Sequence, residues 1–240
     1  MLKQLTVLLA DYVHGQDSKR EDKRAMILLS AFVTMAHKIF CMWKFLCPVR
    51  EVILDVGCGS GRTFRALKFV DSSSGRKLAG AYAIGIDIFR SNLFDAKKVY
   101  DDVVLSDARY LPVKPKSAEL VILSEVLEHL NRSDGLRVLG VIESVAKAQI
   151  MLTTPNGYVY EETAQPDNPW QKHKSGYDET EFSRRGYTIR GIMGIKTRNM
   201  LKKDTFLDLL IGVLTFPASW TVAYRWSFLA NNMLAYKKMP

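Results

Sequence analysis

The 240-residue sequence has few cysteines, few prolines and no long apolar stretch without charged residues. Its three cysteines, Cys41, Cys47 and Cys58, share no zinc-ligand spacing, which excludes a disulfide scaffold and indicates a reducing compartment. Fifteen glycines and eight prolines without a period exclude collagen-like and low-complexity chains. The uncharged stretch 209–224 has sixteen residues and contains a proline, whereas a membrane-spanning helix needs roughly 20 apolar residues.

The chain carries 34 basic and 25 acidic side chains, a formal net charge of +9, and the surplus lies in its flanks. Residues 1–50 hold eight basic and four acidic side chains, and residues 161–240 hold twelve and eight. Residues 51–160 are nearly balanced, with fourteen and thirteen. A basic surplus is typical of a solvated lysine-rich surface, and also of a protein with a polyanionic partner such as RNA or an anionic membrane. The composition leaves both interpretations open.

Short apolar runs alternate with helical segments from residue 51 onward. Five of these runs predict strands at 51–57, 82–88, 103–108, 120–126 and 149–155, and two more are expected at 187–195 and 231–237. Because most runs are apolar on both faces, they predict a largely parallel sheet covered by helices on both sides, an α/β doubly wound fold. Ligands of such sheets bind beyond the carboxyl ends of the strands, so the residues that follow each run are the candidates for a site.

Two further regions differ from this pattern. Residues 1–48 have apolar side chains at helical spacing and predict a helical N-terminal cap on a domain that covers residues 49–240. An apolar helical insertion is expected at about 200–229, before the last strand. Three interpretations of this insertion stay open: a buried helical pair, the wall of a pocket for an apolar substrate, and shallow insertion into a membrane.

A glycine-rich loop, LDVGCGSGR, directly follows the first predicted strand. Glycines let a backbone turn tightly and approach a ligand, and the next helix offers unpaired N–H groups. A dinucleotide fingerprint requires a sixth-position glycine, but counting from Gly57 that position is Arg62. A P-loop is excluded as well, because no Gly-Lys-Ser/Thr sequence follows.

The spacing D-x-G-x-G-x-G resembles motif I of the class I S-adenosylmethionine-dependent methyltransferases, and the resemblance extends through residues 51–157. It is similar to the methyltransferase type 11 or ubiquinone O-methyltransferase-like branch, which implies a Rossmann-like sheet of seven strands, the last one antiparallel. The residues that the resemblance implies for binding S-adenosylmethionine are Asp55, Gly57, Gly59, Gly61, Asp87, Ile88, Asp107, Ala108 and Ser124. In that family the acid after the second strand accepts the ribose hydroxyls, and the acid after the third strand reads the adenine amino group.

The fourth run ends in SEVLEHL, residues 124–130, which resembles the same branch. If a helix begins near Glu125, the side chains of Glu125, Glu128 and His129 share one face and can bind Mg²⁺ or Mn²⁺, with His173 as a further ligand. This pattern also looks like the metal site of small-RNA 2′-O-methyltransferases. In the alternative interpretation no metal binds, the carboxylates are solvated or capping, and His129 contacts the cofactor or the substrate. An oxygen nucleophile would benefit from a base, for which His129 is the candidate catalytic residue, or from a metal that lowers its pKa.

The resemblance implies an enzyme that transfers the methyl group of S-adenosylmethionine, and we expect the acceptor atom to be an oxygen of a small or lipid-like molecule. One alternative is metal-dependent methylation of an RNA ribose, and another is a cofactor-binding module without activity. The expected location is the cytoplasm, with peripheral membrane contact as a further interpretation of the apolar insertion.

Overall fold

The computed structural model describes residues 35–158, 168–195 and 220–240. Residues 1–34 of the expected N-terminal cap and residues 200–219 of the expected apolar insertion lie outside the described residues. Of the cap, residues 35–45 form a helix, and of the insertion, residues 220–225 are helical.

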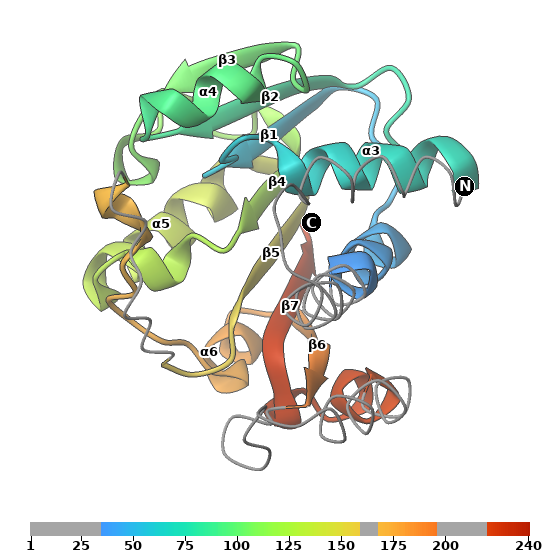
Figure 1. The fold of residues 1–240 in the computed structure, drawn as a ribbon, viewed down its shortest axis with the longest axis vertical. Coiled ribbons are helices and arrows are strands. Elements are labelled where there is room, and N and C mark those ends of the chain that lie inside the picture. Colours follow the sequence, from blue (N-terminus) through green and yellow to red (C-terminus); the bar gives the residue numbers. More distant parts are fainter. Residues whose placement is uncertain (1–34, 159–167, 196–219) are drawn as a thin grey trace, which may run out of the picture.

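Seven strands form one sheet in the order β3-β2-β1-β4-β5-β7-β6 (Figure 1). The strands are β1 (Val52–Val56), β2 (Tyr82–Asp87), β3 (Asp102–Leu105), β4 (Ala118–Ser124), β5 (Ala146–Pro155), β6 (Thr188–Ile195) and β7 (Ala230–Lys238). All neighbouring pairs from β3 to β5 are parallel, and β7 runs antiparallel to both β5 and β6. The predicted doubly wound fold with an antiparallel last strand is therefore confirmed.

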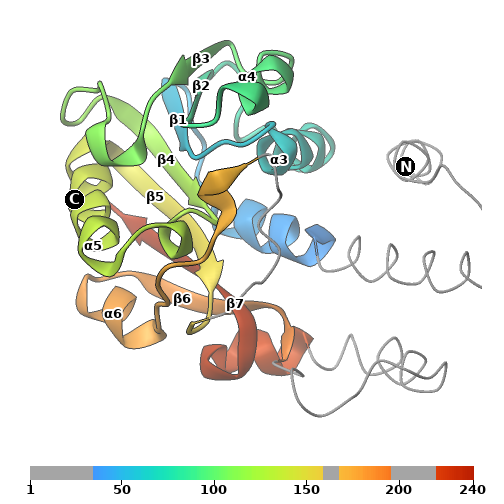
Figure 2. The same ribbon diagram turned by 60° about the vertical axis from the view of Figure 1, so that its left-hand side comes forward.

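Helices cover both faces of this sheet (Figure 2). The α-helices are α3 (Arg62–Ser74), α4 (Arg90–Ala96), α5 (Arg132–Val145) and α6 (Glu179–Arg184), and single 3₁₀ turns form η1 (Ala108–Tyr110), η2 (Leu127–His129), η3 (Pro169–Gln171) and η4 (Ser227–Leu229). Helix 35–45, α3 and α4 contribute to the hydrophobic core on one face, and α5 and α6 to the core on the other.

Alternation along the central strands produces these two cores. In β4, Leu120 and Ile122 pack on the side of α3, whereas Val121 and Leu123 pack on the side of α5, and all four are buried. A strand turns successive side chains to opposite faces, so a strand that is covered on both sides must be apolar at every position. The continuous apolar runs seen in the sequence follow from this burial.

The strand order reverses between β1 and β4. From β1 the chain proceeds outward through β2 and β3, and it then returns to β4 on the other side of β1. The loops that leave β1 and β4 therefore diverge to opposite faces and leave a crevice at the carboxyl edge of the sheet. Among the described residues, no helix combines the length and apolar character needed to cross a bilayer.

Candidate active site

The glycine loop after β1 passes directly against the loop after β4. Gly57, Gly59 and Gly61 all have positive φ angles, between +54° and +81°. A Cβ atom on Gly57 would lie 2.3 Å from Cγ2 of Val126, so a side chain at this position would clash with the residue after Glu125. A Cβ atom on Gly59 would meet no atom within 4 Å, which means that this glycine borders open space. The loop thus brings bare backbone to the edge of a cavity.

Asp87, the last residue of β2, ties the glycine loop to the neighbouring strand. Its Oδ2 atom accepts a hydrogen bond from the Gly59 amide at 2.8 Å, and its Oδ1 atom accepts from the Phe89 amide at 2.8 Å and the Asn92 side chain at 3.2 Å. The carboxylate is only 7% exposed and borders the same cavity. A carboxylate offers about four acceptor sites, so Asp87 keeps capacity for a further donor.

A cavity open to solvent lies between these loops. Six of the nine predicted cofactor residues line it: Gly57, Gly59, Asp87, Ile88, Asp107 and Ala108. Of the predicted catalytic and metal-binding residues, His129 and Glu125 line it too. Residues far apart in the sequence therefore meet at the carboxyl edge of the sheet, as the strand pattern predicted.

The other three predicted cofactor residues do not line the cavity. Asp55 is 2% exposed within β1 and accepts a 2.6 Å hydrogen bond from the Tyr100 hydroxyl. Gly61 is the N-cap of α3, and the Ser124 hydroxyl hydrogen-bonds the Thr153 hydroxyl at 2.9 Å. These three residues make contacts within the protein, and their contact with the cofactor stays a prediction.

The expected helix from Glu125 is wrong. Glu125 has a φ of +56°, a left-handed conformation that cannot continue into a right-handed helix, and only the 3₁₀ turn η2 follows before α5 begins at Arg132. The predicted single face of Glu125, Glu128 and His129 is therefore not formed. A helical i, i+3, i+4 pattern does not reveal such a backbone reversal.

The Glu125 carboxylate is directed to the N-terminal helix. It forms a 2.8 Å ion pair with Lys38, whose side chain is 3% exposed, and it accepts hydrogen bonds from Thr153 at 2.7 Å and Asn232 at 3.0 Å. Burial opposes ionisation of Glu125, but the charge and hydrogen bond of Lys38 outweigh it and lower the pKa of this carboxyl group. Glu125 is thus an ionised residue fixed by three donors.

Glu128, His129 and His173 come together beside Glu125. One potential ligand atom from each lies within 4.8 Å of the others, and the two imidazole rings have centroids 4.9 Å apart. Burial, followed by the charge of Glu125, raises the pKa of Glu128 well above its usual range. The Glu128 carboxyl group is hydrogen-bonded by Thr154 at 3.0 Å. Three of the four predicted metal ligands are therefore adjacent, whereas Glu125 is outside this cluster.

Several lining residues were not predicted from the sequence. They are Phe89, Asn92, Ser106, Arg109, Val126, Leu130, Asn131, Asp134, Asn168, Trp170, Gln171 and Lys174. Arg109 stands two positions after a predicted site acid, which could have marked it. Lys38 lies 87 positions from Glu125, and no local pattern indicates their contact.

Comparisons with known proteins agree with this geometry. The family described as "Methyltransferase domain" matches residues 54–149. A SAM-dependent methyltransferase from Archaeoglobus fulgidus is 20% identical at a TM-score of 0.54, with 89% of this chain and 94% of that chain covered. Magnesium protoporphyrin IX methyltransferase from Synechocystis PCC 6803 is 15% identical at a TM-score of 0.50, covering 95% and 88%. A comparison of the sequence with curated proteins gives no match.

The fold alone does not fix the reaction, because the [4+2]-cyclase SpnF has it too, at 16% identity, a TM-score of 0.51 and coverage of 84% and 80%. Residues 54–149 match a methyltransferase domain, and the strand order agrees with the class I methyltransferase fold of the similar solved structures.

The Asp87→Ala variant is expected to weaken S-adenosylmethionine binding by more than 100-fold, because it removes a buried acceptor at the cavity wall. Isothermal titration calorimetry measures the affinity. Asp95→Ala is the matched control, since Asp95 on α4 is an exposed acid that pairs with Lys98. An unchanged affinity of Asp87→Ala, with Asp95→Ala also unchanged, would contradict the role of Asp87.

The Asp55→Asn variant tests the buried acid in β1. Burial raises the pKa of Asp55 from 3.8 to about 6, although the hydrogen bond from Tyr100 and the charge of Lys38 oppose this. The folded state therefore binds the proton more tightly, and the wild type loses about 3 kcal/mol of stability as the pH rises from about 4 to above 6.

Urea denaturation gives the free energy of unfolding of both proteins at each pH. The stability of Asp55→Asn relative to the wild type should be about 3 kcal/mol greater at pH 7 than at pH 4. The exposed acid Asp102 provides the control variant Asp102→Asn, which makes the same substitution at the surface. The same difference at both pH values for Asp55→Asn would refute a raised pKa.

Proposed function

We propose that the protein transfers the methyl group of S-adenosylmethionine to an oxygen atom of a small or lipid-like acceptor, with His129 as the base. The observation that carries this proposal is that His129 borders the same cavity as Gly57, Gly59 and Asp87. An imidazole beside the cofactor site can accept the proton of a hydroxyl group while the carbon–oxygen bond forms.

The cavity walls fit the cofactor. The open space at Gly59 allows an elongated ligand to lie on the backbone, and Asp87 retains acceptor capacity for hydroxyl donors. When bound, the cofactor supplies an electrophilic methyl group, and the protein contributes mainly the alignment of the acceptor with that group. In this proposal Gly57 and Gly59 bind, Asp87 orients, and His129 removes a proton from the acceptor oxygen.

The lining near His129 supports an acceptor that is partly apolar. Val126, Leu130 and Trp170 border the cavity on this side, and Trp170 is 38% exposed. Lys174 also borders it, with its ammonium group 5.8 Å from the centroid of the Trp170 ring. A cation next to an apolar wall suits an acceptor with an anionic group and a hydrophobic body, such as a lipid-like molecule.

The His129→Asn variant should retain S-adenosylmethionine affinity within about twofold and lose methyl transfer by about 100-fold, because general-base catalysis contributes roughly 10²–10⁴. The assay measures transfer of isotope-labelled methyl from the cofactor into the lipid, small-molecule and RNA fractions of an extract of the cells that produce the protein. Label in the lipid or small-molecule fraction is expected for the wild type.

The exposed residue Tyr82, at the opposite end of β2 from Asp87, provides the control variant Tyr82→Phe, which should behave as wild type. Full activity of His129→Asn would overturn the assignment of the base. Label confined to RNA would favour the ribose alternative, and tight cofactor binding without label in any fraction would indicate a module without activity.

A second candidate function is metal-dependent methylation of an RNA ribose, and the cluster of Glu128, His129 and His173 favours it. Two imidazoles and a carboxyl group within 4.8 Å of one another fit Mn²⁺ or Mg²⁺ with water as the remaining ligands. A bound cation would lower the pKa of an acceptor hydroxyl. Glu125 is not part of this ligand set, because its carboxylate already binds Lys38, Thr153 and Asn232.

If the cluster binds metal, His173→Ala should weaken Mn²⁺ binding at least tenfold, measured by calorimetry and by electron paramagnetic resonance of the free ion. Lys174→Ala is the matched control, since it alters the next residue without removing a ligand. Equal Mn²⁺ binding by wild type and His173→Ala, or no binding by the wild type, would refute the metal site.

A further inference from the structure

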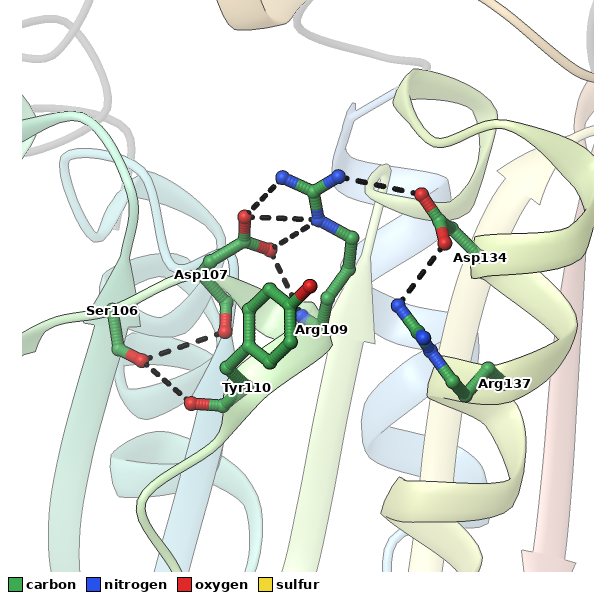
Figure 3. Close-up of polar contacts among 6 residues, drawn as sticks. All are labelled: Ser106, Asp107, Arg109, Tyr110, Asp134 and Arg137. Carbon is green, nitrogen blue, oxygen red and sulfur yellow. Dashed lines mark hydrogen bonds and ion pairs between the residues drawn. The ribbon is translucent and has the colours of Figure 1, made fainter.

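Four charged side chains of alternating sign are linked in series: Asp107, Arg109, Asp134 and Arg137 (Figure 3). Asp107 follows β3, and Asp134 lies in the first turn of α5. The Arg109 guanidinium lies between these two acids, and Asp107, Arg109 and Asp134 all border the cavity. Arg137, one turn further along α5, pairs with Asp134 at 3.1 Å and does not border it.

Arg109 determines the orientation of the Asp107 carboxylate. The backbone amide of Arg109 donates to Oδ1 at 2.9 Å, its Nε atom lies 3.0 and 2.9 Å from the two oxygens, and Nη2 donates to Oδ2. Burial opposes ionisation of Asp107, but these bonds outweigh it and lower its pKa. Three N–H groups of one residue thus fix the rotamer of the carboxylate, and because the single Nε–H is shared between the two oxygens, about one of the roughly four acceptor sites remains for a ligand.

The backbone around this pair is fixed as well. Asp107 is the N-cap of η1, and the Ser106 hydroxyl donates to the carbonyl oxygen of Tyr110 at 3.1 Å. The Tyr110 amide donates to the Asp107 carbonyl oxygen at 2.9 Å. The turn therefore presents the Asp107–Arg109 pair as one rigid unit toward the cavity.

The contact of Arg109 with Asp134 on α5 is weaker than its contact with Asp107. Its Nη1 atom lies 3.3 Å from Oδ2 of Asp134, and 29% of the Arg109 side chain is exposed. A ligand that enters beside Asp107 can displace this long, partly exposed contact without breaking the two-pronged bond to Asp107. In this series of ion pairs, the contact of Arg109 with Asp107 is thus firmly held, whereas its contact with Asp134 can be displaced.

We propose that Arg109 is a positioning residue that fixes the Asp107 carboxylate for the exocyclic amino group of the cofactor's adenine. This inference rests on the proposed cofactor site. The remaining acceptor site of Asp107 suits an N–H donor, which adenine has at its 6-position and hypoxanthine lacks. A carboxylate that is already oriented loses little conformational freedom when it binds, so Arg109 increases both affinity and selectivity for the amino group.

The experiment compares the binding of S-adenosylhomocysteine and its inosine counterpart, in which oxygen replaces the amino group, by calorimetry. The wild type should prefer the adenine compound by at least tenfold. In Arg109→Ala that preference should fall to about twofold or less, with weaker binding of the adenine compound. Arg137→Ala removes a charge from the same series of ion pairs without touching Asp107 and should keep the wild-type preference.

A merely structural role of Arg109 would weaken both compounds equally and leave their ratio unchanged, which would overturn the proposal. Tighter binding of the adenine compound by Arg109→Ala would also overturn it, because the Arg109 side chain would then occupy the position of the adenine ring. Arg109→Lys keeps the charge but not the two-pronged bond, and it should lose the preference as well. If the wild type binds neither compound, the cofactor site itself is wrong, which is distinct from a failure of this inference.

Discussion

The site depends on a steric constraint where the glycine loop meets the end of β4. A side chain at Gly57 would collide with Val126, so the segments that leave β1 and β4 can lie in contact at this point, before they turn to opposite faces, only because Gly57 has no side chain. The amides of Gly57 and Cys58 both donate to the carbonyl oxygen of Ile86, at 2.7 and 2.9 Å, which joins the loop to β2. The ends of β1, β2 and β4 therefore lie close together, and the backbone of Gly57 and Gly59 borders the cavity.

The ion pair between Lys38 and Glu125 fixes the side chain of Glu125, the residue after β4 that borders the same cavity as the glycine loop. Lys38 is buried and Glu125 is 32% exposed, and the cost of removing the Lys38 charge from solvent offsets much of their attraction, so the ion pair contributes more to the placement of Glu125 than to stability. Glu125 also has a strained left-handed backbone, which persists only where its surroundings determine it. Donors from helix 35–45, β5 and β7 provide those surroundings. The N-terminal helix thus helps to form the floor of the site as well as covering the sheet.

The sheet could be predicted from the sequence because burial on both faces leaves continuous apolar runs, and six of the nine predicted cofactor residues border one cavity because parallel strands end at one edge. The direction of the Glu125 side chain could not be predicted. A helical pattern places Glu125 with Glu128 and His129, but the φ of +56° turns its carboxylate toward Lys38. His173 was predicted to join Glu128 and His129, but the approach of Asn168, Trp170, Gln171 and Lys174 to the cavity was not predicted, since it depends on contacts such as that between the Lys174 amide and the Glu128 carbonyl oxygen. Such contacts join segments far apart in the sequence and leave no periodicity.

The cavity lining is acidic although the protein as a whole is basic, and this difference bears on the two ligands of a methyltransferase, the methyl donor and the acceptor. The whole chain is basic, yet the cavity is bordered by Asp87, Asp107, Glu125 and Asp134 against Arg109 and Lys174. A sulfonium cofactor is positively charged at the reacting atom, whereas the thioether left after transfer is neutral there, so an acidic lining attracts the loaded form more than the spent one. Weaker attraction after transfer favours release of the product. Under the proposed function the positive charge of Lys174, which borders the same cavity, would attract the other ligand, an anionic acceptor.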